Sequence, residues 1–220
     1  MKNTSFSIGA LLAAIGLLAA PALIFLHAPI EREMGFVQKI FYFHVPCAWL
    51  MFLFTFVCAG GSLAFLVRGS RRGDQVAAAA GELVVLFGLL VLLTGPLWAR
   101  KAWGRWWVWD VRLTSSLMLW MIFVAYLLAR QYGGPAARRL AAGLGIFGAV
   151  EVPLIYVSVN IWRTIHPKTE VVRTLDPGMR PAFWTSFAAI TLLGALLFFL
   201  RVALERARGD LEDLYLATEE

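Results

Sequence analysis

Six stretches of the chain are apolar and close to the length that a helix needs to cross a lipid bilayer. A transmembrane helix takes about 20 residues to cover about 30 Å of hydrocarbon. Lipid offers the backbone no hydrogen-bond partner and the alternating pattern of strands is missing, so the stretches are predicted to be helices. They comprise residues 8–26, 45–67, 76–97, 113–130, 140–161 and 182–203. We therefore predict an all-α integral membrane protein, a single domain over residues 1–220 built as a bundle of six transmembrane helices.

The composition agrees with a membrane protein and argues against a nucleic-acid-binding one. Hydrophobic residues make up 60% of the chain and the mean hydropathy is +0.73, both far from the soluble average. The net charge is +6, but the lysines and arginines are scattered over the polar segments between the spans. Scattered cations suit phospholipid headgroups and anions bound at the loops, so we expect the lipid bilayer and no nucleic acid as a partner.

Two features of the first two spans have plain interpretations. Residues 18–22 are small and follow an apolar run, which is typical of a cleaved signal, but Lys2 alone supplies positive charge and the run is long enough for a retained span. Cys47 and Cys58 lie in the second span, nearly on one helix face and about 16 Å apart. That separation excludes a disulfide between them, so both are predicted to be packing residues.

The alternating direction of the spans sorts the connections onto two sides. His27, His44, the stretch 98–114 and His166 are predicted to share one side, opposite both termini. The twenty lysines and arginines divide equally between the two sides, so the positive-inside rule does not orient the protein. Either another feature fixes the topology, or the histidine side keeps its cations because an anionic ligand binds there.

The connection between the third and fourth spans is rich in tryptophan. Five tryptophans fall within residues 98–110, and an aromatic belt at the membrane interface explains Trp98 better than the four that follow it. Trp103, Trp106 and Trp107 have the spacing of one helical face, so a short helix would present a shelf of rings. Such a shelf could lie on the membrane or hold a flat apolar ligand, and haem is the natural candidate.

His44 and His166 are candidate ligands of a haem iron. Neutral imidazole is a common axial ligand, and two histidines from different connections could bind iron from opposite faces. The alternative is that each lies at the membrane interface and hydrogen-bonds to headgroups. His27 has no aromatic or basic cluster around it, and we expect it at the interface.

Charged residues near these groups have more than one possible role. Asp110 could cap the fourth span, pair with Arg112, or orient a ligating histidine. Glu82 and Glu151 lie within spans, where ionisable residues are often functional. Candidate partners for haem propionates are Arg100, Lys101, Arg105, Arg112, Arg163, Lys168, Arg173 and Arg180. The chain has no glycine-rich phosphate-binding loop and no CxxC pair, so any energy for its function is expected from a partner.

Four motifs resemble one family. Residues 103–114, WGRWWVWDVRLT, are similar to the WWD signature of haem-handling proteins. Residues 41–49, 151–167 and 175–180 resemble the flanking motifs of one branch of these proteins, CcmC, in the same order. The similarity covers about residues 36–187.

The resemblance implies a cytochrome c maturation protein of the bacterial inner membrane, with both termini cytoplasmic and a periplasmic haem site. It implies haem b held between His44 and His166 beneath a loop at about 98–114, whose matching residues are Trp103, Trp106, Trp107, Trp109 and Asp110. It also implies a scaffold without catalysis of its own that presents haem to the chaperone CcmE, together with the ATPase CcmA, the membrane subunit CcmB and the small CcmD.

The residues leave other functions open. The chain could move haem across the membrane as a transporter subunit, or carry electrons as a b-type cytochrome with two histidine ligands. A small-solute transporter would need a site at the midplane with broken helices, and only residues 151–153 hint at one.

Overall fold

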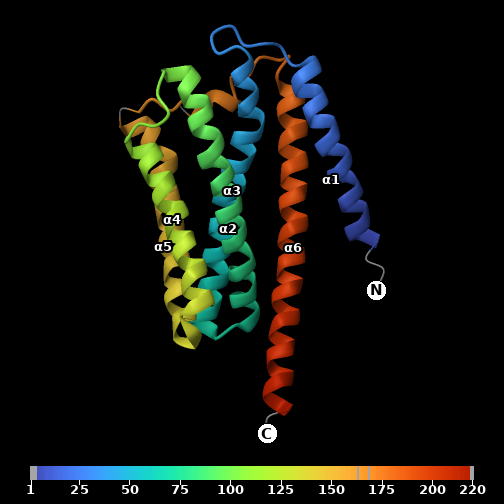
Figure 1. Cartoon of the computed structure of the whole chain (residues 1–220), viewed down its shortest axis with the longest axis vertical. Helices are drawn as coiled ribbons and strands as arrows, with labels where there is room; N and C mark the ends of the chain where they lie inside the picture. Colours follow the sequence, from blue (N-terminus) through green and yellow to red (C-terminus); the bar gives the residue numbers. More distant parts are fainter. Residues whose placement is uncertain (1–3, 163, 168, 219–220) are drawn as a thin grey trace.

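The computed structural model describes residues 4–162, 164–167 and 169–218, and its regular structure is helical throughout these residues (Figure 1). Six of the helices are long and apolar enough to cross a membrane, as predicted. The elements in chain order are α1 (Thr4–Ala22), η1 (Leu23–His27), η2 (Phe36–Ile40), α2 (Phe41–Arg68), α3 (Arg71–Trp103), α4 (Val111–Tyr132), α5 (Gly134–Ile161), η3 (Thr169–Val172) and α6 (Arg180–Thr218).

The helices run alternately up and down, which separates two ends of the bundle. The connections α1–α2, α3–α4 and α5–α6 lie together at the upper end in Figure 1, and the two short turns and both chain ends lie toward the lower one. We call these the histidine end and the terminus end. The predicted grouping of the connections is confirmed.

Local signals set the helix boundaries near the short turns. Gly69 has a φ of 62°, a left-handed conformation that glycine adopts without a steric penalty, and it ends α2. The hydroxyl of Ser70 then accepts a hydrogen bond from the backbone N–H of Gly73 and caps α3. Helices α2 to α6 are all longer than the predicted spans: α2 begins four residues earlier, and the largest extension is in α6, which continues to Thr218.

Small residues allow close helix packing within the bundle. A Cβ at Gly61 of α2 would lie 2.6 Å from the carbonyl oxygen of Gly73 on α3, so the two backbones nearly touch. A Cβ at Gly16 of α1 would lie 2.9 Å from the Cβ of Ala189 on α6. Helices α2 to α5 pack around one apolar core, α6 packs on α2 and α3, and α1 packs on α6.

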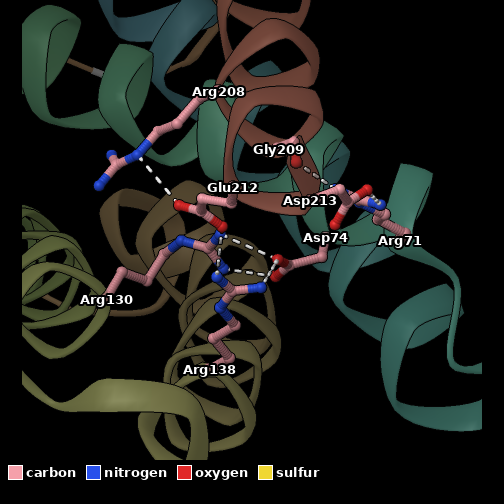
Figure 2. A network of polar contacts seen from close by, with 8 residues as sticks. All are labelled: Arg71, Asp74, Arg130, Arg138, Arg208, Gly209, Glu212 and Asp213. Atoms are coloured by element: carbon pink, nitrogen blue, oxygen red, sulfur yellow. Dashed lines mark hydrogen bonds and ion pairs between the residues drawn. The ribbon is translucent and has the colours of Figure 1, made fainter. Parts of the chain in front are cut away.

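A network of charges joins four helices at the terminus end (Figure 2). Arg130 of α4 donates two hydrogen bonds to the carboxylate of Asp74 on α3, at 2.5 and 3.0 Å, and both side chains are largely buried. Arg138 of α5 lies 3.9 Å from the same carboxylate and 3.6 Å from that of Glu212 on α6. The network therefore reaches α6 at Glu212, beyond the predicted apolar span of that helix.

At the histidine end, a buried lysine holds α1 in place. The ammonium of Lys39 in η2 donates hydrogen bonds to the carbonyl oxygens of Ile24 and Ala28, both at 2.6 Å. Carbonyl groups at the end of a helix otherwise have no partner, so Lys39 completes the end of the first span. This ties α1 to the segment that leads directly into α2.

Candidate functional site

A cavity of about 400 Å³ opens at the histidine end of the bundle. Its walls come from α2, α3, α4 and α5 and from the segment that follows α5. The residues that line it include five of the predicted site residues: His44, Trp103, Trp107, Arg112 and His166. Both predicted ligands therefore face one space. His27 is exposed and does not line the cavity.

His44 is fixed in one tautomer by a neighbour on α3. It lies in the first turn of α2, is 8% exposed, and has its Nδ1 2.8 Å from the hydroxyl oxygen of Thr94. That hydroxyl donates its single proton to the carbonyl of Leu90 at 2.6 Å, so it must accept from His44. A neutral His44 therefore carries its proton on Nδ1, and its Nε2 keeps a free lone pair.

His166 has the same tautomer for a different reason. Its Nδ1 lies 2.9 Å from the carbonyl oxygen of Pro167, which can only accept, so Nδ1 carries the proton. Burial and, to a smaller extent, the nearby positive charge of Arg112 lower the pKa of His166 from 6.5 to about 4. The hydrogen bond to Pro167 and the charge of Asp110 oppose this shift in pKa. The ring is therefore neutral at pH 7, as a metal ligand must be.

The tryptophan loop does not form the predicted short helix. Helix α3 ends at Trp103 because Gly104 takes a left-handed conformation with a φ of 70°, and residues 104–110 are irregular. Trp103 and Trp107 line the cavity, whereas Trp106 and Trp109 are 56% and 76% exposed. The prediction that Trp103, Trp106 and Trp107 share one helical face is wrong, since the turn at Gly104 redirects the chain.

Aromatic contacts extend this wall. The ring of Trp98 lies 6.2 Å from that of His44 and 6.3 Å from that of Trp103. Trp109 packs edge-on against Trp107 at 5.8 Å. The indole Nε1 of Trp107 is buried and has no hydrogen-bond partner among the described residues. An acceptor from outside the chain would satisfy this donor.

Asp110 links the tryptophan loop to the segment that carries His166. One carboxylate oxygen caps α4 by accepting from the backbone N–H of Leu113 at 2.8 Å. The other accepts from the hydroxyl of Thr164 and from the N–H of Ile165. The hydroxyl oxygen of Thr164 accepts in turn from the N–H of His166 at 3.1 Å. Asp110 thus caps α4, as predicted, and it also holds the segment of His166 through Thr164 and the backbone, without contact to the imidazole ring.

The candidate cations separate into those that line the cavity and those that do not. Arg112 and Arg173 line it, and Arg112 also donates a hydrogen bond to the carbonyl of Ile155. Arg105 is exposed and does not line it. Arg100 lies over the ring of Trp106, 5.9 Å from its centroid, and does not line it either. Arg163 and Lys168 lie outside the described residues.

The two acidic residues predicted within spans have different surroundings. Glu82 pairs with Arg201 of α6 near the terminus end. The Oε2 atom of Glu151 is buried and has no hydrogen-bond partner among the described residues. Neither residue lines the cavity.

Sequence reasoning missed Thr94 and the carbonyl of Pro167. A threonine within an apolar span has no distinctive signal, and a carbonyl acceptor belongs to every residue. Only the approach of α2 to α3 identifies Thr94 as the partner of His44.

The side chains of the site limit the kind of metal that it could hold. Among the residues that the structure describes, no three His, Cys, Asp or Glu side chains gather as a site for a bare metal ion. Two imidazoles with free Nε2 atoms suit a metal that brings its other ligands with it, as the iron of a haem does.

Comparison with known proteins adds an independent observation. The profile of the CcmC family, described as Heme exporter protein C, matches residues 1–218. A Bradyrhizobium diazoefficiens protein named Heme exporter protein C is 36% identical over 173 residues, covering 78% of this chain and 66% of its own length. The Escherichia coli protein of that name is 34% identical over 180 residues, or 80% of this chain and 73% of its own length.

The relatives also include a plant mitochondrial protein. A ccmC-like protein of Arabidopsis thaliana, whose name refers to cytochrome c biosynthesis, is 31% identical over 180 residues, or 80% of this chain and 69% of its own length. The match across nearly the whole chain, with six transmembrane helices, places this protein in the CcmC family, described as Heme exporter protein C.

Proposed function

We propose that the protein binds haem in the cavity at its histidine end, with the Nε2 atoms of His44 and His166 as the two axial ligands of the iron. The observation that carries this proposal is the shared state of the two histidines. Each donates its Nδ1 proton to an oxygen of the protein, and both line the same cavity. Metal-ligating histidines almost always have such a partner on the second nitrogen, which fixes the ring and its tautomer.

The remaining walls suit the other parts of haem. The cavity of about 400 Å³ falls in the range of small-molecule sites, about 300–1,000 Å³. Trp103 and Trp107 offer apolar ring surface to the macrocycle. Arg112 and Arg173 suit the carboxylates of the propionates, and the unpaired Nε1–H of Trp107 suits an acceptor oxygen. Haem b has a flat apolar macrocycle and two propionates, and it has no covalent link to the protein.

The family and the exposed part of the loop support a role in handing haem on. Relatives named Heme exporter protein C and the cytochrome c biosynthesis relative connect the family to haem handling during cytochrome c maturation. We place the histidine end on the periplasmic side of the bacterial inner membrane, with both termini cytoplasmic. Trp106 and Trp109 present exposed rings beside the cavity, where the chaperone CcmE would dock to receive haem. CcmA, CcmB and CcmD would complete the assembly and supply ATP hydrolysis.

Visible spectroscopy of the purified full chain tests the binding site. Wild-type protein reconstituted with haem is expected to give the spectrum of a low-spin iron with two imidazole ligands. His44→Ala and His166→Ala should each lose this signature, whereas His27→Ala should keep it. A wild-type spectrum that is unchanged in both of the first two variants would rule out the ligand assignment.

A further inference from the structure

The cavity continues past the site of the two histidines onto the membrane-facing surface of α2. Four residues of α2 line this part: Val45, Ala48, Trp49 and Phe52. Their spacing, i, i+3, i+4 and i+7, makes one stripe along the helix, and it extends about 10 Å along the axis. Val45, Ala48 and Phe52 are half-buried, whereas Trp49 is 51% exposed, so the stripe reaches the outer surface of the bundle at Trp49.

The same surface of α2 is apolar well beyond the cavity. Trp49 is followed at helical spacing by Leu53, Phe56 and Leu63, which are 49%, 49% and 55% exposed. Exposed apolar side chains at this depth of a transmembrane helix face hydrocarbon. The rim of the cavity at Trp49 thus lies about 7 Å further along α2 than His44, beside an exposed apolar surface of a helix that is long enough to cross a membrane.

The neighbouring helix α5 provides the opposite side of this rim. Tyr156 lines the cavity and is 43% exposed, five residues before α5 ends at Ile161. Helices α2 and α5 pack against each other along the bundle. Two half-exposed aromatic residues, Trp49 and Tyr156, therefore line one cavity from adjacent helices.

We infer that this opening, bordered by Trp49 on α2 and Tyr156 on α5, is a lateral gate through which haem passes from the outer half of the bilayer into the cavity. The inference rests on the proposed function, since it gives the route to the same site. Haem is a flat apolar molecule with two carboxylates at one edge. Passage within lipid keeps the macrocycle out of water, whereas passage through the aqueous end would expose it. The carboxylates travel at the headgroup level and meet Arg112 and Arg173, which line the cavity.

Haem uptake by proteoliposomes tests the lateral gate. The full-length protein is reconstituted without haem in phosphatidylcholine vesicles, haemin is added to the bilayer, and growth of the Soret band gives the rate of uptake. Ala48→Leu narrows the opening and should slow uptake about tenfold, the factor that an added barrier of about 1.4 kcal/mol gives. Trp49→Ala widens the opening and should speed uptake. Phe56→Ala is the matched control, because Phe56 lies on the same exposed surface but does not line the cavity, and its rate should equal that of the wild type.

The final amplitude of the Soret band keeps the two proposals apart. Equal uptake rates in all four proteins, each reaching the full spectrum of the doubly ligated iron, would overturn the lateral gate and leave the proposed function standing. A wild type that never reaches that spectrum would overturn both. If Ala48→Leu binds no haem at all, Trp49→Ala decides: faster uptake than in the wild type supports the gate, and an unchanged or slower rate refutes it.

Discussion

The hydrogen bond between Thr94 and His44 offers the sharpest test of the site. Thr94→Val removes the hydroxyl and keeps a side chain of nearly the same shape, so α3 should pack as before. The change leaves the buried Nδ1–H of His44 without its acceptor at 2.8 Å. A buried donor that loses its partner costs about 1–3 kcal/mol, and the ring is then free to rotate or to move its proton to Nε2.

Haem affinity should fall because the ring of His44 is no longer held in the orientation and the tautomer that bind iron. Loss of the partner of a ligating histidine typically reduces affinity by about 10- to 100-fold, which corresponds to about 1.4–2.7 kcal/mol. This range lies within the cost of about 1–3 kcal/mol for a buried donor without its partner, so we expect Thr94→Val to reduce haem affinity by about 10- to 100-fold. The assay is a titration of the apoprotein with haemin, followed by the absorbance of the Soret band. Thr94→Ser is the matched control, since it keeps the hydroxyl, and its affinity should stay close to that of the wild type.

Two results would refute this reasoning. Wild-type affinity in Thr94→Val would mean that the hydroxyl does not hold the ligating ring. An equal loss in Thr94→Ser and Thr94→Val would mean that the packing of the threonine methyl group, and not its hydrogen bond, sets the affinity.

Three further predictions concern other parts of the chain. Asp110→Ala removes both the cap of α4 and the anchor of the segment after α5, so haem affinity should fall while helical content by circular dichroism stays near that of the wild type; a normal affinity would contradict the anchoring role. Arg130→Met leaves the buried carboxylate of Asp74 without its main partner, a loss of about 3–5 kcal/mol for such pairs, and should lower the thermal midpoint in detergent by several degrees; an unchanged midpoint would show that the pair does not stabilise the fold. Trp107→Ala should weaken haem binding in a titration. Trp106→Ala should leave haem affinity unchanged, because the exposed Trp106 should matter only for capture by the chaperone. A reduced haem affinity in Trp106→Ala would place that ring in the site.

The sequence determined the architecture because its signals are local. Hydropathy over about 20 residues identifies a span wherever it occurs, and the alternation of spans then groups His44, His166 and the tryptophan loop at one end. These predictions needed no knowledge of which helices are neighbours.

Only the tertiary structure decided which side chains enter the site. The i, i+3, i+4 pattern of Trp103, Trp106 and Trp107 failed as a helix, because the left-handed turn at Gly104 changes the direction of every side chain after it. The partner of His44 comes from α3, fifty residues further along the chain. How helices far apart in sequence pack together decides where a side chain points beyond a turn and which partner it meets. Hydropathy and residue spacing along the chain do not contain this information.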